Sequence, residues 1–411
     1  EADTVPATAT LIDRYQIELE AITTLAELLA TAPGVQAVQS GPAGSLTSVF
    51  IRGANAKHTL ALYDGIRIND ASSATGVFNP GSDTLGDAGR VEIVRGPLSS
   101  IYGSDAVGGV INILPRALPD DGLQAYGSAE LGDLGTRRAN AGLGYGGGRW
   151  RLGASVELMD TDGYDVTPAR LSTANGDADG AQFRTVTLRG EAGLTETLEV
   201  DALYRWRESQ VEFDTFSGGP SGFQRADDPD LESEDDLQLL ALGLTHTTNR
   251  LRTRVRTGRV KTALDSFDGA VLTDTYESQR DFTEARTSFE PGGALSPVLT
   301  LGLDWHDEAI ATDTAFNAPL SVSEDALSGY GIIQASVGDL TLTGSLRHDD
   351  YERFGSQTTH NIGAVWLLEP FSTRLRASWG TSFKAPTLSE RFASSAFITP
   401  NPGLSPEEGE T

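Results

Sequence analysis

The chain contains no cysteine among its 411 residues. Without a thiol it cannot use a cysteine nucleophile, which excludes one large group of enzymes. A protein that crosses an oxidising compartment gains from this absence, because stray thiols would form unwanted disulfides there. No signal peptide stands at Glu1, so we expect an exported protein to be seen here in mature or trimmed form.

Long apolar runs and an excess of basic residues are missing as well. Only 38% of the residues are hydrophobic, and no apolar run approaches the roughly 18 residues of a membrane-spanning helix. Lysine and arginine number 31 against 58 aspartates and glutamates, so the formal net charge is −27. This charge argues against nucleic acid as a partner and leaves a cationic partner, a bound metal or a well-solvated surface.

The usual catalytic and cofactor motifs are absent too. The histidines have no metal-ligand spacing such as HExxH, and no phosphate-binding Gly-Lys-Ser/Thr loop occurs. We therefore expect a protein that is not an enzyme, with no basis for a dehydrogenase, a hydrolase or a nucleoside triphosphatase. The five histidines are His58, His246, His306, His348 and His360.

The segment up to about Pro115 has a mixed α/β pattern. Thr23–Leu29 is predicted to form a helix with its leucines on one face, and the Ala-Pro-Gly at 32–34 ends it. Short apolar runs follow, separated by loops rich in glycine and asparagine, and they predict strands. These runs are Ser48–Ile51, Leu60–Tyr63, Arg90–Val94 and Val110–Leu114.

From about Leu123 onward, apolar and polar residues alternate strictly, as in strands with one apolar and one polar face. Tight turns such as Gly146–Gly148 and Thr248-Asn249 alternate with long polar segments. This rhythm favours a transmembrane β-barrel over a soluble sandwich or propeller, with about 13 strands in this chain. Long loops are expected near Asp160–Gln182, Glu208–Asp236, Asp265–Glu277, Thr312–Leu327 and Asp349–Thr358.

Two stretches of the first segment resemble the plug domain of TonB-dependent outer-membrane receptors. They are VFIRGANAKHTLALYDGIRIND at Val49–Asp70 and RVEIVRGPLSSIYGSDAVGGVINI at Arg90–Ile113. LAELLATAPGV (Leu25–Val35) and, far downstream, WGTSFKAPTLSERF (Trp379–Phe392) are similar to the family as well. Within the family, the amino-acid sequence of the plug segment and the GYDV motif at Gly163–Val166 resemble the cobalamin receptors most.

The resemblance implies an α/β plug domain, residues 1–116, inside an antiparallel transmembrane β-barrel that begins at residue 117 and occupies the rest of the chain, 117–411. The family's barrels have about 22 strands, so we expect this barrel to be incomplete here. An unclosed barrel would leave two bare edges in lipid, and we therefore expect the natural protein to be longer. The short box that TonB grips normally precedes the segment matching Val5–Arg14, and we do not see it here.

The resemblance also implies which plug residues face the barrel wall and which face the ligand. Arg52 and Arg95 are expected to pair with wall carboxylates, with Glu390 and Glu407 as the candidates. Two polar loops are expected at the upper surface of the plug, where ligand contacts occur in the family. Their candidate ligand-binding residues are Asn55, Lys57, Asn69, Ser72, Ser73 and Asn79.

Acidic residues in the first two long barrel loops point to a structural Ca²⁺ ion, because Ca²⁺ takes six to eight oxygen ligands and carboxylates supply them well. The resemblance adds weight, because the cobalamin receptors place calcium-binding aspartates in the corresponding loops. The alternative is a set of solvated loop charges. The expected ligands are Asp165, Asp177, Asp179, Asp214 and Asp227, with Asp228 as the alternate for Asp227.

The implied function is TonB-dependent uptake, across the bacterial outer membrane, of a large and scarce ligand. Cobalamin or a related corrinoid leads, and a ferric siderophore is the alternative. The expected partners are TonB, this ligand and outer-membrane lipid. From other classes, a passive porin would lack the plug segment, and a soluble glycan-binding protein would not expose apolar strand faces to water.

Overall fold

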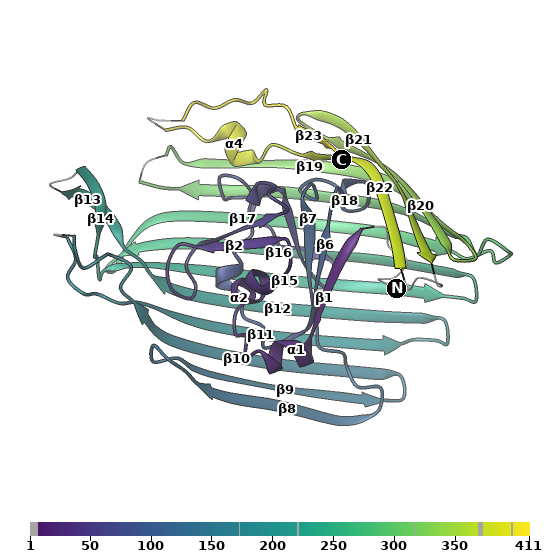
Figure 1. The fold of residues 1–411 in the computed structure, drawn as a ribbon, viewed down its shortest axis with the longest axis horizontal. Coiled ribbons are helices and arrows are strands. Elements are labelled where there is room, and N and C mark those ends of the chain that lie inside the picture. The colour runs from purple at the N-terminus through teal and green to yellow at the C-terminus, as the bar shows by residue number, and fades with distance from the viewer. Residues whose placement is uncertain (1–6, 172, 220–221, 316, 369–372, 396–397) are drawn as a thin grey trace.

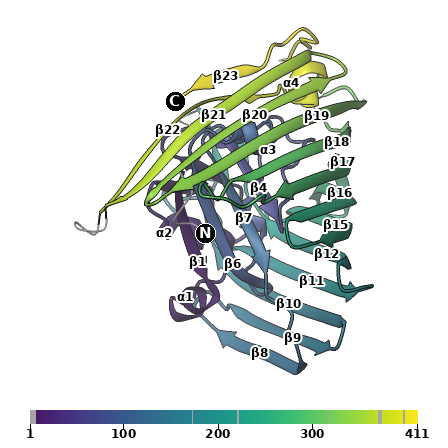
Figure 2. The ribbon, with the colours of Figure 1, turned by 90° about the vertical axis from the view of Figure 1, so that its right-hand side faces the viewer.

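The computed structural model describes residues 7–171, 173–219, 222–315, 317–368, 373–395 and 398–411. It has two parts, a small α/β plug and a large antiparallel sheet that curves around it (Figures 1 and 2). This is the plug and barrel architecture that the sequence predicts.

The plug is built on a five-stranded sheet of order β1-β6-β7-β4-β5, in which only β4 and β7 are parallel. A separate hairpin, β2-β3, carries a loop toward the barrel wall. The elements are β1 (Thr8–Asp13), α1 (Arg14–Leu19), α2 (Leu25–Thr31), β2 (Val35–Gln39), β3 (Thr47–Ile51), η1 (Ala56–His58), β4 (Thr59–Tyr63), β5 (Ile66–Arg67), η2 (Pro80–Ser82), β6 (Ala88–Arg95), α3 (Ser99–Tyr102) and β7 (Gly109–Pro115).

Helix α2 forms where the sequence predicts it, for two local reasons. Thr24 and Glu27 make a reciprocal capping box at its start. Leu25, Leu28 and Leu29 are all fully buried on one face. None of the helices in the described part of the chain is long and apolar enough to cross a membrane.

The barrel strands form one 14-stranded antiparallel sheet that runs in sequence order from β8 to β23 and omits only the short hairpin β13-β14. Thirteen of its strands are long, in line with the prediction, and the short β23 pairs with the last of them. The strands are β8 (Gly122–Leu131), β9 (Arg137–Gly147), β10 (Trp150–Tyr164), β11 (Asp179–Gly193), β12 (Leu198–Glu212), β15 (Leu231–Thr247), β16 (Leu251–Asp268), β17 (Val271–Phe289), β18 (Val298–Asp313), β19 (Leu320–Val337), β20 (Leu340–Tyr351), β21 (Gly355–Leu368), β22 (Thr373–Lys384) and β23 (Glu407–Glu410); β13 is Thr215–Gly219, β14 is Gly222–Ala226, and α4 is Leu388–Phe392.

The alternation along each strand separates two faces. Leu240, Leu242 and Leu244 of β15 are 52%, 55% and 42% exposed, whereas Leu237 and Leu239 are buried in the core that the sheet shares with the plug. Similar exposed apolar residues stand on most of the other barrel strands. The outer face is thus apolar, as lipid requires, and the inner face holds the plug.

Several of the predicted long loops are shorter than expected. The segment Asp265–Glu277 is strand except for a two-residue turn between β16 and β17, and Asp349–Thr358 contains only a short turn between β20 and β21. In both segments polar residues interrupt the strict alternation that marks strands in the sequence, although the backbone pairing continues. The long connection 213–230 does leave the wall, and it contains the hairpin β13-β14.

Buried ion pairs fix the plug against the wall. Arg205 of β12 is fully buried and reaches Asp83 at 2.6 Å and Asp87 at 3.2 Å. Glu157 of β10 accepts hydrogen bonds from the Thr84 hydroxyl and from the Gly86 amide, both at 2.7 Å. These contacts hold the plug segment 83–87 against β10 and the middle of β12.

A third contact lies near α3. The Lys384 ammonium group is 2.6 Å from Asp105, which also pairs with Arg67. Burial alone would raise the pKa of Asp105, but the charges of Lys384 and Arg67 outweigh it and lower the pKa to about 2. Asp105 is therefore charged at neutral pH and binds β22 to the plug.

Candidate functional site

A cavity of about 390 Å³ lies between the upper loops of the plug and the wall strands β11, β12, β15 and β16. On the plug side it is lined by the loop 40–46 and by part of the loop that follows Asn69, including Ser73, Val77 and Asn79. On the wall side it is lined by Arg207, Ser209 and neighbouring inward residues, and by parts of the loops above them. It is the natural candidate for the ligand site.

Loop 40–46 reaches the wall because glycines allow a close approach. Gly44 has φ +89°, and a Cβ there would lie 2.5 Å from the Val211 side chain. Gly81 packs under this loop, since a Cβ on it would lie 2.2 Å from the Ser45 carbonyl oxygen. Larger residues would push the loop off the wall and change the shape of the cavity.

Asn79 joins the two plug loops of the cavity. Its Oδ1 accepts hydrogen bonds from the Thr47 amide at 2.9 Å and the Gly81 amide at 3.0 Å, and its Nδ2 donates to Ser82. Most of the hydrogen-bonding capacity of Asn79 is used inside the plug. Asn79 therefore contributes to the cavity mainly by holding the plug loops that line it.

The other predicted ligand-binding residues lie in different places. Ser73 lines the cavity, whereas Ser72 is fully buried and donates to Asp70. Asn69 is committed to backbone groups, because its Oδ1 accepts from the Ala61 amide and its Nδ2 donates to carbonyls. Among the six candidates, Ser73 and Asn79 are the cavity residues.

Asn55 and Lys57 belong to a second location, facing the last part of the chain. Asn55 caps η1 by accepting from the Lys57 amide. The Lys57 ammonium group pairs with Glu407 of β23 and lies 3.5 Å from Glu390 of α4. His58 Nε2 is 2.9 Å from Glu407.

The expected pairing of Arg52 and Arg95 with Glu390 and Glu407 needs correction. Both carboxylates do contact the plug, but the cation opposite them is Lys57. Arg52 donates to the Thr8 hydroxyl at 3.0 Å, and Arg95 lies opposite Thr8 in the β1–β6 register. The Nε and Nη2 atoms of Arg95 are buried without a partner among the described residues, so neither arginine pairs with these carboxylates there. Burial, then the charge of Arg52, lowers the pKa of Arg95.

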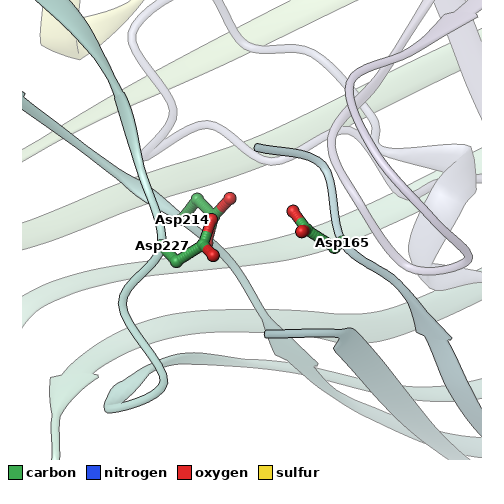
Figure 3. Close-up of side chains that lie close together, drawn as sticks. All are labelled: Asp165, Asp214 and Asp227. Atoms are coloured by element: carbon green, nitrogen blue, oxygen red, sulfur yellow. The ribbon is translucent and has the colours of Figure 1, made fainter. Parts of the chain in front are cut away.

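Three aspartates come together above the cavity. Carboxylate oxygens of Asp165, Asp214 and Asp227 all lie within 4.8 Å of one another (Figure 3). They come from the segment after β10, the residues after β12 and the residues after β14. The cluster therefore joins the first two long loops of the barrel, as the sequence predicts for these three positions.

Backbone amides of the loops orient these carboxylates. Asp165 accepts from the Thr167 amide at 2.7 Å, and Asp227 accepts from the Gly176 amide at 2.9 Å. The backbone amide of Asp228 donates a hydrogen bond to Asp214 at 3.4 Å. Of the two alternates, Asp227 is the one whose carboxylate belongs to the cluster.

Asp177 and Asp179 flank the cluster. Asp179 accepts from the Val166 amide at 3.2 Å and also lines the cavity. The pKa of Asp177 is raised, first by burial and then by the charges of Glu212, Asp214 and Asp227. All five predicted aspartates are therefore gathered in one acidic region.

The donor set fits a hard divalent cation. Three carboxylates from two loops converge, and the Oδ1 atom of Asp227 is buried with no hydrogen-bond partner among the described residues. An oxygen-only set of this kind suits Ca²⁺. Bound Ca²⁺ would supply positive charge that offsets the mutual repulsion of the carboxylates.

Sequence reasoning missed the loop 40–46 and the inward residues Arg207 and Ser209 as parts of the site. The turn-forming residues SGPAGS at 40–45 predict a loop, but this short sequence does not indicate that the loop contacts the barrel wall. The alternation along β12 does place Arg205 and Arg207 on the polar, inward face, and this signal could have identified them.

Comparison with known proteins agrees with this architecture. The family model described as the TonB-dependent Receptor Plug Domain matches residues 1–110, and the model described as TonB dependent receptor-like, beta-barrel, matches residues 123–411. The structure has β7 ending at Pro115 and β8 beginning at Gly122, and the boundary at 116/117 stays a prediction.

Curated relatives include two proteins named vitamin B12 transporter BtuB. The one from Vibrio vulnificus (strain CMCP6) is 28% identical over 98% of this chain and 63% of its own length. The one from Vibrio cholerae serotype O1 (strain M66-2) is 30% identical over 100% of this chain and 64% of its own length. The chain thus spans less than two thirds of the length of these relatives.

Solved structures share the fold at low sequence identity. A ferric enterobactin receptor from Pseudomonas aeruginosa has a TM-score of 0.78 at 16% identity, covering 97% of this chain and 67% of that one. The siderophore receptor PirA from Acinetobacter baumannii has a TM-score of 0.77 at 17% identity, covering 98% and 67%. Because one family model accounts for the plug and the other for the barrel strands, this chain belongs to the TonB-dependent receptor family.

Proposed function

We propose that this protein is an outer-membrane receptor that binds a corrinoid of the cobalamin type at its extracellular face for TonB-dependent uptake. The names of the curated relatives support the ligand class, at 28–30% identity over nearly the whole of this chain. The apolar outer face of the barrel strands supports a location in a membrane.

The charge of the cavity is the observation that carries the choice of ligand. Five carboxylates line it against two arginines. An anionic ferric chelate would meet net repulsion there, whereas a corrinoid with amide side chains and no large net charge would not. The carboxylates are Asp70, Asp179, Glu212, Asp214 and Asp235, and the arginines are Arg207 and Arg225. The likeness to siderophore receptors, at 16–17% identity, supports the fold alone.

Calcium has a defined place in this proposal. An ion held by Asp165, Asp214 and Asp227 fixes the first two long loops relative to each other and lowers the negative charge above the cavity. Loops ordered before the ligand arrives lose less conformational entropy on binding, which strengthens affinity.

The plug separates this proposal from a passive porin. Core residues of the plug and of β12, β15 and β16 form one buried cluster, so the inside of the barrel is occupied by protein on that side. Passage then requires a change in the plug. Energy from TonB is the source that the family implies.

The test is a pair of calorimetric titrations on the purified receptor in detergent with Ca²⁺ present. We expect saturable binding of cyanocobalamin and no measurable binding of ferric enterobactin under the same conditions. Binding of ferric enterobactin alone would replace the corrinoid with a siderophore. Binding of neither probe would remove both ligand classes.

A further inference from the structure

Two inward residues of β12 carry hydrogen-bond donors that nothing in the described protein uses. The side chain of Arg207 is 3% exposed, and its Nε and Nη1 atoms are buried without a partner. Ser209 is fully buried, and its Oγ atom also has no partner. Both residues line the cavity described above.

Unsatisfied buried donors cost free energy and are rare in folded proteins. Other inward residues of the described wall, Thr185 and Arg256 among them, also have buried atoms without a partner, but they do not line this cavity. Arg205, two residues earlier on the same face, uses its Nε on Asp87 and both of its Nη atoms on Asp83. Among the described residues with unused buried donors, Arg207 and Ser209 are the two that line the cavity, so their donors are the ones placed to meet its occupant.

The charge of Arg207 is already balanced. Its Nη2 atom donates to Asp235 Oδ1 at 2.6 Å, which anchors the guanidinium group and pairs its positive charge with a carboxylate. The remaining donors can bind an acceptor oxygen without needing a negative charge on it. Because the cavity is otherwise acidic, a neutral carbonyl oxygen suits them better than an anion.

These donors lie deep in the cavity. Ser209 and Arg207 stand three and five residues before the end of β12 at Glu212, which is about 10 and 16 Å along the strand. A group that projects from the ligand can reach donors at this depth.

We propose that Arg207 and Ser209 form a subsite that binds the carbonyl oxygen of an amide side chain projecting from the ligand. This inference rests on the proposed function and adds the chemical group of the ligand that the cavity binds. It makes Arg207 and Ser209 specificity-determining residues, because a ligand without a projecting acceptor leaves their donors unpaired.

The test uses two serines that line the same cavity. Ser209→Ala removes an unused hydroxyl, whereas Ser233→Ala removes one that already donates to the Val211 carbonyl oxygen at 3.3 Å. Calorimetry with cyanocobalamin is expected to show affinity about five- to tenfold weaker for Ser209→Ala and within about twofold of wild type for Ser233→Ala. Arg207→Lys keeps the charge opposite Asp235 but loses the other donors, and we expect it to weaken affinity about tenfold.

A second probe identifies the group that is bound. Dicyanocobinamide keeps the peripheral amides of cyanocobalamin and lacks its phosphate-linked nucleotide. If the subsite binds an amide, Ser209→Ala and Arg207→Lys weaken both probes equally. A loss confined to cyanocobalamin would assign the donors to the phosphate and overturn the amide.

The two proposals fail in different ways. If wild-type receptor binds the probes and both Ser209→Ala and Arg207→Lys behave like Ser233→Ala, the subsite is wrong and the receptor function stands. If wild-type receptor binds neither probe, the proposed function falls and the subsite with it. A thermal midpoint within a few degrees of wild type confirms that each variant is folded.

Discussion

Neighbouring residues on the inner face of β12 have separate tasks. Arg205 is fully buried in a network with Asp83, Asp87 and the ring of Tyr63, 4.5 Å away. Arg207, two residues closer to the outside, faces the cavity with unused donors. At the scale of single residues, the position along one strand thus separates the residues that hold the plug from those available to a ligand.

The first of these tasks predicts a large effect on stability. Replacing Arg205 with methionine leaves the charges of Asp83 and Asp87 buried without a cation, and this is expected to lower the free energy of unfolding by about 3–5 kcal/mol. Arg259→Met is the control, because the pair of Arg259 with Asp281 is largely exposed and contributes about 0–1 kcal/mol. Thermal melts of both variants in detergent compare them. Equal midpoints would show that the buried pairs do not hold the plug.

The sequence predicts which residues are charged and inward, but not which of them meet. The alternation along β12 places Arg205 and Arg207 on the polar face, and the structure puts them there. Which charged residues pair with each other depends on how the plug is positioned within the sheet. A local sequence pattern does not contain this information. For this reason Lys57, expected to touch ligand, stands opposite Glu407, while Arg52 is held at Thr8.

At the scale of elements, strands were easier to predict than loops. Period-two alternation located β10, β12 and β20 because each has one apolar and one polar face. The strand ends at the turn between β16 and β17 were predicted as a loop because polar residues such as Asp265, Asp268 and Asp274 interrupt the alternation there. The aspartates of the two long loops were predicted from the acidic residues there together with the resemblance to cobalamin receptors, which place calcium-binding aspartates in the corresponding loops.

The joined loops predict a calcium dependence of ligand binding. Chelation of Ca²⁺ should weaken the affinity for cyanocobalamin about tenfold, because the first two long loops lose the ion that orders them. The double substitution Asp214→Asn and Asp227→Asn should weaken it to the same extent and abolish the response to chelator. Calorimetry with and without EGTA measures both effects.

Asp230→Asn serves as the control, since Asp230 is exposed in the same loop and outside the cluster. We expect it to leave affinity and calcium response unchanged. If wild-type affinity is the same with Ca²⁺ and with EGTA, calcium has no part in binding and the acidic region is a solvated surface.

At the scale of the whole molecule, the arrangement combines an apolar exterior, an occupied interior and an acidic opening. The sheet presents leucines outward along strands such as β15, and its inner face shares a core with the plug. The acidic cluster joins the loops above a cavity that reaches the plug. For the proposed uptake, the plug must rearrange before a ligand bound outside can pass, and TonB is the proposed source of energy for that step.

The most direct measurement is uptake of radiolabelled cyanocobalamin by Gram-negative cells that lack their own cobalamin receptor and express this one. We predict accumulation in cells with TonB and surface binding without accumulation in matched cells without TonB. Equal accumulation in both strains would contradict driven uptake. Absence of binding and of accumulation in both would contradict the corrinoid ligand.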